Sequence, residues 1–139
     1  MIYAVIDTNV LVSALFTSNK DAATVKVAEA ILCGSIIPLL NDEIFEEYTD
    51  VLNRPKFSFS KRLVKDFLES IKGIGIVTRR SESNETFVDQ KDIVFYEVAL
   101  SKEEAYLVTG NAKHFPKSPI VVTPSEMIKI LEEATNKAT

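Results

Sequence analysis

Residues 2–14 read Ile-Tyr-Ala-Val-Ile-Asp-Thr-Asn-Val-Leu-Val-Ser-Ala. An apolar run of strand length, Ile2 to Ile6, ends at Asp7, and a helix start follows it. A nearly continuous apolar strand is typical of a strand that helices cover on both faces. The stretch therefore predicts the first strand and helix of a parallel α/β sheet, with Asp7 at the carboxyl end of the strand.

The rest of the chain repeats this alternation of strand-length apolar runs and segments of helical period. Four further strands are predicted: Ile36 to Leu40, Ile74 to Thr78, Tyr106 to Thr109 and Ile120 to Val122. Pro38 fits poorly in the second strand, because proline has no N–H to donate to a sheet. In open α/β sheets ligands bind at the carboxyl ends of the strands near a topological switch point, so that edge is where a site is expected.

Capping residues predict where the helices begin. Asp21 can cap a helix that reaches Cys33, and Asp42 can cap one that reaches about Asn53. Ser60 opens a third helix that runs to about Lys72, and residues 93–100 form a buried helix. The clearest start is Thr123-Pro124-Ser125-Glu126, a capping box with proline at the first helical position. Residues 79–86 are polar and are expected to form a mobile loop.

Length and composition narrow the class of protein. The chain has 139 residues, 46% hydrophobic and 26% charged, which fits one globular domain over residues 1–139. A single cysteine excludes an intramolecular disulfide framework and favours a reducing, cytoplasmic setting. No basic leader and no apolar run near the roughly 20 residues of a membrane span is present, so neither secretion nor membrane insertion is expected. The net charge of −4 argues against binding nucleic acid with the whole surface.

Polar residues fall where predicted strands end and predicted helices begin. Asp7 follows the first strand, and Asn111 follows the fourth in Thr109-Gly110-Asn111. Each also has a simple structural explanation, since Asp7 can cap a helix and Asn111 can serve a turn. Asp92 stands at the head of the buried helix and can cap it as well.

One acid of the helix that begins near Asp42 differs from its neighbours. At 100° per residue, Glu47 lies at the margin of the apolar face, whereas Glu43, Glu46 and Asp50 point toward solvent. The alternative is that Glu47 is an ordinary border residue whose carboxylate reaches water.

Taken together, these residues predict one polar rim formed by Asp7, Glu47, Asp92 and Asn111. Two unpaired carboxylates at 4 Å repel by about 4 kcal/mol at an effective dielectric constant of 20. A group of three therefore needs a cation or a shared proton. Oxygen ligands without a nearby histidine or cysteine suit Mg²⁺ or Mn²⁺, which activate water and neutralise charge on a phosphodiester.

The chain resembles a PIN domain in the order and spacing of four elements. These are the segments Asp7-Thr8-Asn9-Val10-Leu11-Val12-Ser13-Ala14, Glu47-Tyr48 followed by Val51-Leu52-Asn53-Arg54-Pro55-Lys56-Phe57, Asp92, and Leu107-Val108-Thr109-Gly110-Asn111. The resemblance covers residues 2 to about 130 and is closest to the prokaryotic toxin components related to VapC-type ribonucleases. It implies a Rossmann-like three-layer α/β/α sandwich around a mostly parallel five-stranded sheet. It also implies a Mg²⁺- or Mn²⁺-dependent endonuclease acting on RNA, often a homodimer that a cognate antitoxin protein inhibits.

The resemblance also assigns roles to residues. The first, second and third acids of the family fall on Asp7, Glu47 and Asp92, which can together hold one metal ion. The usual fourth acid falls on Asn111, a departure that puts a second metal in doubt, because asparagine offers a neutral oxygen and cannot act as a base. Asn9 and Thr109 are expected to support the acids rather than bind metal.

A basic stretch from Arg54 to Lys65 contains five basic residues and no acid, interleaved with Phe57 and Phe59. Arg54, Lys56, Lys61 and Arg62 are the candidate RNA-binding residues. The alternative is a solvated helix start with two core phenylalanines. His114, close to the rim in sequence, could contact a phosphate but is favoured as a surface turn residue.

The hypothesis that follows is a metal-dependent endoribonuclease selective for single-stranded RNA. Asp7 and Asp92 are its main metal ligands, Glu47 is a direct or water-mediated ligand, and Asn111 is a polar support. One alternative is a catalytically weak module of the same fold that binds RNA or protein. Another is a phosphohydrolase of small substrates, which is disfavoured because Asp7-Thr8-Asn9 lacks a second acid two residues after the first.

Overall fold

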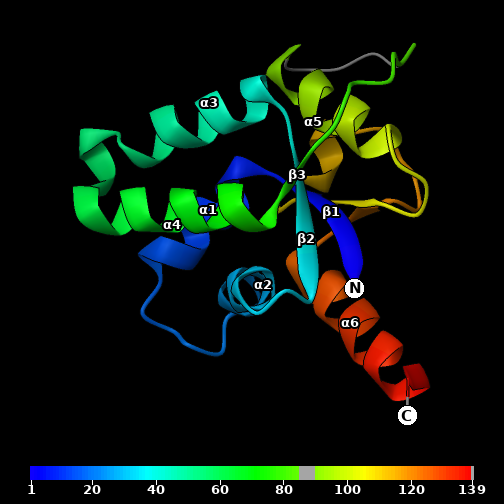
Figure 1. Cartoon of the computed structure of the whole chain (residues 1–139), viewed down its shortest axis with the longest axis horizontal. Coiled ribbons are helices and arrows are strands. Elements are labelled where there is room, and N and C mark those ends of the chain that lie inside the picture. Colours follow the sequence, from blue (N-terminus) through cyan, green and yellow to red (C-terminus); the bar gives the residue numbers. More distant parts are fainter. Residues whose placement is uncertain (85–89, 139) are drawn as a thin grey trace.

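A five-stranded sheet forms the centre of the computed structural model, which describes residues 1–84 and 90–138 (Figure 1). The strands are β1 (Ile2–Ile6), β2 (Ile36–Leu40), β3 (Ile76–Val77), β4 (Tyr106–Val108) and β5 (Val121–Val122). The α-helices are α1 (Thr8–Phe16), α2 (Ala23–Leu32), α3 (Asp42–Leu52), α4 (Lys61–Ile74), α5 (Gln90–Leu100) and α6 (Pro124–Ala138). Two short 3-10 helices complete the set, η1 (Pro55–Phe57) and η2 (Ala112–His114).

The strand order is β3-β2-β1-β4-β5, and every pairing is parallel. The chain moves outward from β1 to β3, then returns to the other side of β1 to form β4. The strand order thus reverses between β1 and β4, and this is the topological switch point where a ligand is expected. The prediction of a parallel α/β fold with these five strands is confirmed.

Helices cover both faces of the sheet. Helix α5 packs on β1, β2 and β4, whereas α2 packs on β2 and contacts α1, α4 and α6. Figure 1 shows α5 on one side of the sheet and α1, α2 and α4 on the other. Helix α3 contacts α1, α4 and α5 near the carboxyl edge. The three layers predicted from the resemblance are therefore present.

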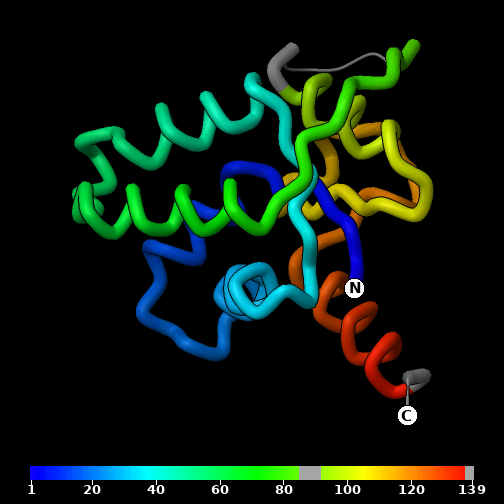
Figure 2. The backbone as a smooth tube through the Cα atoms, in the orientation of Figure 1, coloured from blue at the N-terminus to red at the C-terminus, as the bar shows by residue number. Residues whose placement is uncertain are grey.

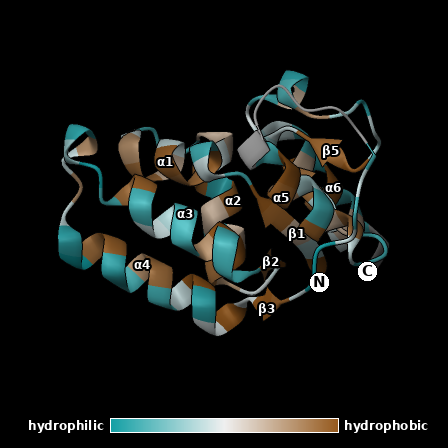
Figure 3. Ribbon diagram, turned by 90° about the horizontal axis from the view of Figure 1, so that it is seen from above, coloured by the Kyte–Doolittle hydropathy of each residue, from teal (hydrophilic) through white to brown (hydrophobic). Residues whose placement is uncertain are grey.

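The core lies between the strands and the inner faces of these helices. Hydrophobic residues fill the strands and the inward positions, and hydrophilic residues alternate with them along α3 and α4 (Figure 3). Pro38 is buried inside β2, where its missing N–H does little harm. The Leu40 carbonyl accepts a hydrogen bond from Thr78 N on the β3 side, so Pro38, two residues earlier, faces the same side before β3 has begun.

Of the four helix starts assigned to Asp21, Asp42, Ser60 and Thr123, two are correct and two are wrong. Ser60 accepts a hydrogen bond from Leu63 N, and the Thr123–Glu126 capping box forms in both directions. Helix α3, however, is capped by Asn41, whose Oδ1 accepts from Ile44 N, and Asp42 is its first residue. Helix α2 begins after Ala22, one residue later than an Asp21 cap requires. In both cases the neighbouring residue took the extended backbone of the cap position.

The third strand is shorter than predicted, because α4 continues through Ile74 and leaves only Ile76–Val77 in β3. Gly75 joins the two elements at a point of close approach. A Cβ at this position would lie 2.7 Å from Leu40 Cδ1 and 3.0 Å from the Pro38 carbonyl oxygen. The turn from α4 into the sheet therefore requires glycine.

Within the part of the chain that the structure describes, no helix has both the length and the apolar character that crossing a bilayer demands.

Candidate functional site

Asp7 lies at the switch point, directly after β1, and its side chain points toward β4. The residue is 8% exposed, and its Oδ2 accepts a hydrogen bond of 2.6 Å from the hydroxyl of the fully buried Thr109. Asp7 also occupies the cap position of α1, but its side chain makes no capping hydrogen bond. The explanation of Asp7 as a helix cap therefore does not account for where the carboxylate is held.

Burial raises the pKa of Asp7 above its usual value of 3.8, and the charge of nearby Glu47 raises it further. The Thr109 hydroxyl and the backbone N–H groups of Thr8 and Asn9 work in the opposite direction and favour the charged form. The negative charge at this position is thus incompletely compensated by the protein, which is the electrostatic situation that a bound cation relieves.

Helix α3 holds Glu47 beside Asp7 through two adjacent contacts. The Thr8 hydroxyl donates to the Glu47 carboxylate, and the hydroxyl of the fully buried Tyr48 donates to the Ile6 carbonyl. These contacts join Glu47-Tyr48 to the residues on either side of Asp7. Glu47 is thus more than an ordinary border residue of α3, since a buried threonine engages its carboxylate.

The turn after β4 is joined to the same place. Asn111 N donates to Thr109 Oγ1 over 3.0 Å, and Gly110 N donates to Asn9 Oδ1 over 3.4 Å. The hydroxyl of Thr109 therefore accepts a hydrogen bond from the backbone of the turn and donates one to Asp7. Asn111 itself is exposed at this edge.

Asp92 lies in the first turn of α5, where a carboxylate is favoured by the helix dipole. It does not cap the helix as predicted, because α5 begins at Gln90, two residues earlier. Its Oδ2 is 3.7 Å from Nδ1 of His114, which lies in η2 and is half exposed. The His114 N–H donates to the Asn111 carbonyl over 2.9 Å, so Asp92 adjoins the turn that also carries Asn111.

A continuous polar set thus runs along the carboxyl edge between β1 and β4. Successive polar contacts connect Asp7 to Thr109, Asn111, His114 and finally Asp92. The hydrogen bond from Thr8 adds Glu47 to this set. Among the residues that the structure describes, no three histidine, cysteine or acidic side chains are grouped closely enough to enclose a metal ion. Mg²⁺ usually keeps several waters and takes one or two carboxylates, so the oxygen donors of this edge suit an open site of that kind.

The basic stretch lies mostly away from this edge. The turn between α3 and α4, which contains η1, is at the end of the helix pair farthest from the sheet (Figure 2). Arg54 lies two residues beyond the end of α3 and lines the same surface groove as Glu47. It pairs with Asp50 over 3.1 Å, and Lys56 lies 5.1 Å from the centre of the Phe57 ring. Lys61 and Arg62 are exposed in the first turn of α4.

The sequence left open whether Phe57 and Phe59 stack on RNA bases or pack in the core. Phe59 packs against the core, as the structural alternative requires. Phe57 stacks on Phe59, with ring centres 5.4 Å apart and planes inclined by 13°. One face of the Phe57 ring is therefore already covered by another ring.

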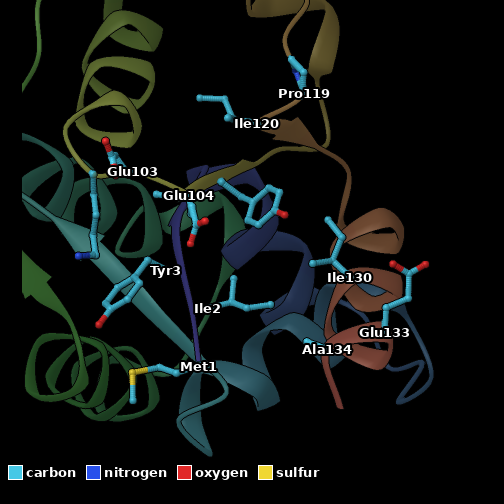
Figure 4. A pocket seen from close by; sticks show the side chains of 13 residues that line it. Met1, Ile2, Tyr3, Glu103, Glu104, Pro119, Ile120, Ile130, Glu133 and Ala134 are labelled. Carbon is cyan, nitrogen blue, oxygen red and sulfur yellow. The ribbon is translucent and has the colours of Figure 1, made fainter. Parts of the chain in front are cut away.

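Two of the surface grooves differ in character. One of about 340 Å³ runs between α3 and α5 beside the acids, lined by Glu43, Glu46, Glu47, Asp50, Arg54, Val94 and Phe95. A larger one of about 850 Å³ lies at the opposite, amino edge of the sheet, where Ile2, Tyr3, Ile120 and Ile130 line it (Figure 4). The candidate site is therefore next to the smaller, acidic groove.

Several residues of this edge were not predicted from the sequence. Thr8, Tyr48 and Arg80 act through contacts to residues 39, 42 and 37 positions away, which no local pattern reveals. His114 was expected to be a surface turn residue, and it does lie in a turn, but next to Asp92. Its position three residues after Asn111 was the one available signal.

Comparison with known proteins gives the class. The family model of the PIN domain matches residues 3–113, from β1 to η2, and the chain belongs to this family. The match contains all four positions of the predicted rim. PIN domains are in general nucleases that use divalent metal ions and act on nucleic acid. Searches of the curated proteins and of the solved structures gave no match.

Proposed function

We propose that this PIN domain is a metal-dependent endoribonuclease that cleaves the phosphodiester bonds of single-stranded RNA. The observation that supports it is the buried Asp7 carboxylate, held at the switch point beside Glu47 with its pKa raised by burial and by the charge of Glu47. The negative charge of Asp7 does not stabilise the protein by itself. It does favour the binding of a cation, and of a phosphate whose charge that cation neutralises.

Asp7 and Asp92 are the main ligands of Mg²⁺ or Mn²⁺ in this proposal, and Glu47 is a direct or water-mediated ligand. A divalent cation there supplies a Lewis acid that neutralises charge developing on the phosphate and makes water a stronger nucleophile at neutral pH. Glu47, held by Thr8, orients the attacking water in line with the scissile bond. Thr109 fixes the rotamer of Asp7 through its 2.6 Å hydrogen bond.

Asn111 limits the site to one cation. Its amide offers only a neutral oxygen where a fourth carboxylate would supply charge for a second metal ion. Asn9 supports the turn that carries Thr109 through its side-chain oxygen, and Asn111 supports it through its backbone N–H. A single metal ion held by Asp7 and Asp92 would neutralise charge on a phosphate bound at the same edge.

Cleavage of single-stranded RNA in the presence of Mg²⁺, Mn²⁺ or a chelator tests the proposal, with Asp7→Asn as the comparison. We expect cleavage by the parent protein with either cation, and none with the chelator or with the variant. Equal cleavage under all conditions would show that the activity belongs to a contaminant or to another site.

The departure at Asn111 favours a second candidate, a catalytically weak PIN module that binds RNA or protein. A ligand that binds only the folded state raises its stability in proportion to the logarithm of ligand excess over Kd. A module without the metal site should therefore melt at the same temperature with and without Mn²⁺. A Mn²⁺-dependent rise that is lost in Asp7→Asn excludes this candidate.

The proposal extends to a biological setting, that of a toxin component whose cognate antitoxin protein inhibits it. It rests on the resemblance to VapC-type ribonucleases, which also makes a homodimer the expected assembly. The single cysteine is consistent with a reducing cytoplasm. A neighbouring gene that encodes a short DNA-binding or acidic partner, and recovery of that partner with the protein, would support this role.

A further inference from the structure

Arg80 links the two helices that carry the acids on either side of the candidate site. Its Nε and Nη2 donate to Glu97 Oε1 over 2.9 and 2.7 Å, and its Nη1 donates to the Glu43 carboxylate over 2.9 and 3.2 Å. Glu97 belongs to α5 and Glu43 to α3. One guanidinium group thus bridges α3 and α5, a geometry that its planar array of donors allows.

The α5 end of this bridge is firmly held. Glu97 is 6% exposed, its Oε2 accepts from Ser83 N over 2.7 Å, and its backbone carbonyl accepts from Ser81 N over 3.0 Å. Burial disfavours the charge on Arg80, but its hydrogen bonds with Glu97 and Glu43 outweigh this and raise its pKa. The described part of the segment expected to be a mobile loop, residues 79–84, therefore contains a well-anchored arginine.

The α3 end of the bridge connects to the site. Glu43 and Glu47 are four residues apart, so they lie on the same face of α3, and both line the groove between α3 and α5. On α5, Glu97 follows Asp92 by five residues. Five residues correspond to about 140° of rotation around the helix, so Glu97 and Asp92 lie on different sides of α5. The contact with Arg80 therefore acts on Asp92 only by setting how far α3 stands from α5.

We propose that Arg80 is a positioning residue of the candidate site, which fixes the separation of Glu47 and Asp92 by bridging Glu43 and Glu97. This rests on the proposed function, because the separation matters only where both carboxylates serve one metal ion. Arg80 touches neither carboxylate and acts on them through the helices. Exposed ion pairs contribute little to stability, so cutting the Glu43 arm should alter the site more than the fold.

Glu43→Gln removes the ionic attraction of the α3 arm, leaving at most a neutral hydrogen bond, and it leaves the buried Arg80–Glu97 pair intact. Glu46→Gln is the matched control, since Glu46 lines the same groove, changes the net charge equally and makes no ion pair among the residues that the structure describes. Arg80→Lys is a second variant, because an ammonium group keeps the charge beside Glu97 but cannot bridge both acids in the same geometry. Arg80→Ala is avoided, as it would leave the buried Glu97 without its cation.

Mn²⁺ titrations followed by the melting temperature measure the effect on the metal site. We expect Glu43→Gln and Arg80→Lys to need about three- to tenfold more Mn²⁺ to reach half of the maximal increase in melting temperature. This is a smaller loss of metal affinity than is typical for a residue that contacts a metal ligand directly. Glu46→Gln should match the parent protein, and all variants should melt near the parent temperature without metal. Equal Mn²⁺ requirements for Glu43→Gln and Glu46→Gln would overturn the positioning role.

A distance measurement without metal separates this inference from the proposed function. Spin labels at Thr49→Cys on α3 and Leu100→Cys on α5, in a Cys33→Ser background, report the spacing of the two helices; all three positions are exposed. We expect Glu43→Gln to broaden or shift the distance distribution and Glu46→Gln to leave it unchanged. Unchanged distances in Glu43→Gln overturn the role of Arg80, whereas a parent protein that Mn²⁺ does not stabilise overturns the proposed function.

Discussion

The surroundings of Asp7 disfavour the charged form of its carboxylate. Burial and the neighbouring Glu47 raise its pKa, so the folded protein binds a proton on Asp7 more tightly than the unfolded chain does. Stability therefore declines as the pH rises from the usual value of 3.8 through the folded-state pKa. Residues selected for a charged site rather than for stability commonly have this property.

Replacing Asp7 with asparagine should accordingly stabilise the protein at neutral pH while abolishing cleavage. Asparagine keeps an oxygen that can accept from Thr109 but carries no charge to bury. We expect a gain of about 0.5–2 kcal/mol in the free energy of unfolding at pH 7, measured by urea denaturation in chelator. The gain should shrink as the pH falls toward 3.8, and a saturating divalent cation should narrow it by stabilising the parent protein alone. A variant less stable than the parent at pH 7 in chelator would contradict the assigned cause.

Thr8 controls the other carboxylate of the pair. Thr8→Val removes the hydroxyl that donates to Glu47 but keeps the shape of this buried side chain. Because Glu47 is partly exposed and can be rehydrated, we expect stability to fall by no more than about 1 kcal/mol. The RNA cleavage rate should fall about tenfold, as is typical when a ligand loses the group that orients it. Thr8→Ser should restore the rate, and a Thr8→Ser variant as slow as Thr8→Val would exclude this role of the hydroxyl.

Among the elements, the junction of α4 and β3 depends most on a single residue. A Cβ on Gly75 would meet Leu40 Cδ1 at 2.7 Å and backbone oxygens of Ile71 and Pro38 at 2.9 and 3.0 Å. The side-chain contact can be relieved by a rotamer change, but the two carbonyl contacts require the backbone to move. The approach of α4 to β2 is therefore limited by the size of this residue.

Gly75→Ala should destabilise the protein by about 1–3 kcal/mol, the usual cost of forcing extra volume into a packed position. Gly73→Ala provides the matched control, because Gly73 lies in the same helix and a Cβ added there would meet nothing within 4 Å. Alanine there should stabilise the helix by about 0.5–1 kcal/mol. Urea denaturation of both variants measures the two effects, and effects of the same sign would contradict this assignment.

The elements were predictable where local chemistry determines them. The apolar runs of β1, β2 and β4 and the capping box of α6 are each specified within a few residues, and their predicted positions are correct. The caps of α2 and α3 were displaced by one residue, since adjacent residues compete for a cap and only the backbone path decides between them. The contacts of Arg80 were not predictable, because they depend on the packing of α3 against α5.

The order of the strands brings residues that are distant in the sequence together in one candidate site. Asp7 and Thr109 are 102 residues apart, yet they meet because β1 and β4 are neighbours at the switch point. The sequence predicted that polar residues would gather at the carboxyl edge, since parallel strands end on one side. The resemblance led us to expect that Thr109 supports an acid, but the contact of the Thr8 hydroxyl with Glu47 was not predictable, because it depends on how α3 packs beside β1.

Acidic and basic side chains gather in different parts of the surface. The groove beside the site is lined by four carboxylates, while five basic residues gather between Arg54 and Lys65. Further basic residues, Lys113 and His114, lie in η2 next to Asn111. In the proposed function, RNA would meet favourable charge at these basic residues rather than along the acidic groove, although the net charge of the protein is −4.

The salt dependence of RNA binding tests whether the outer cations take part. Each phosphate contact with a single strand contributes about 0.7 to the slope of log K against log salt concentration. Arg54→Ala/Lys56→Ala should therefore weaken the binding of single-stranded RNA and lower the magnitude of the slope by roughly 1.4, if both side chains contact phosphates. Lys26→Ala/Lys129→Ala, which removes the same charge from exposed positions on α2 and α6, is the control and should leave the slope unchanged. Both measurements use the Asp7→Asn background, so that RNA is bound and not cut. Equal slopes for the two double variants would show that the net charge of the protein, rather than contacts at the α3–α4 turn, accounts for the contribution of these residues.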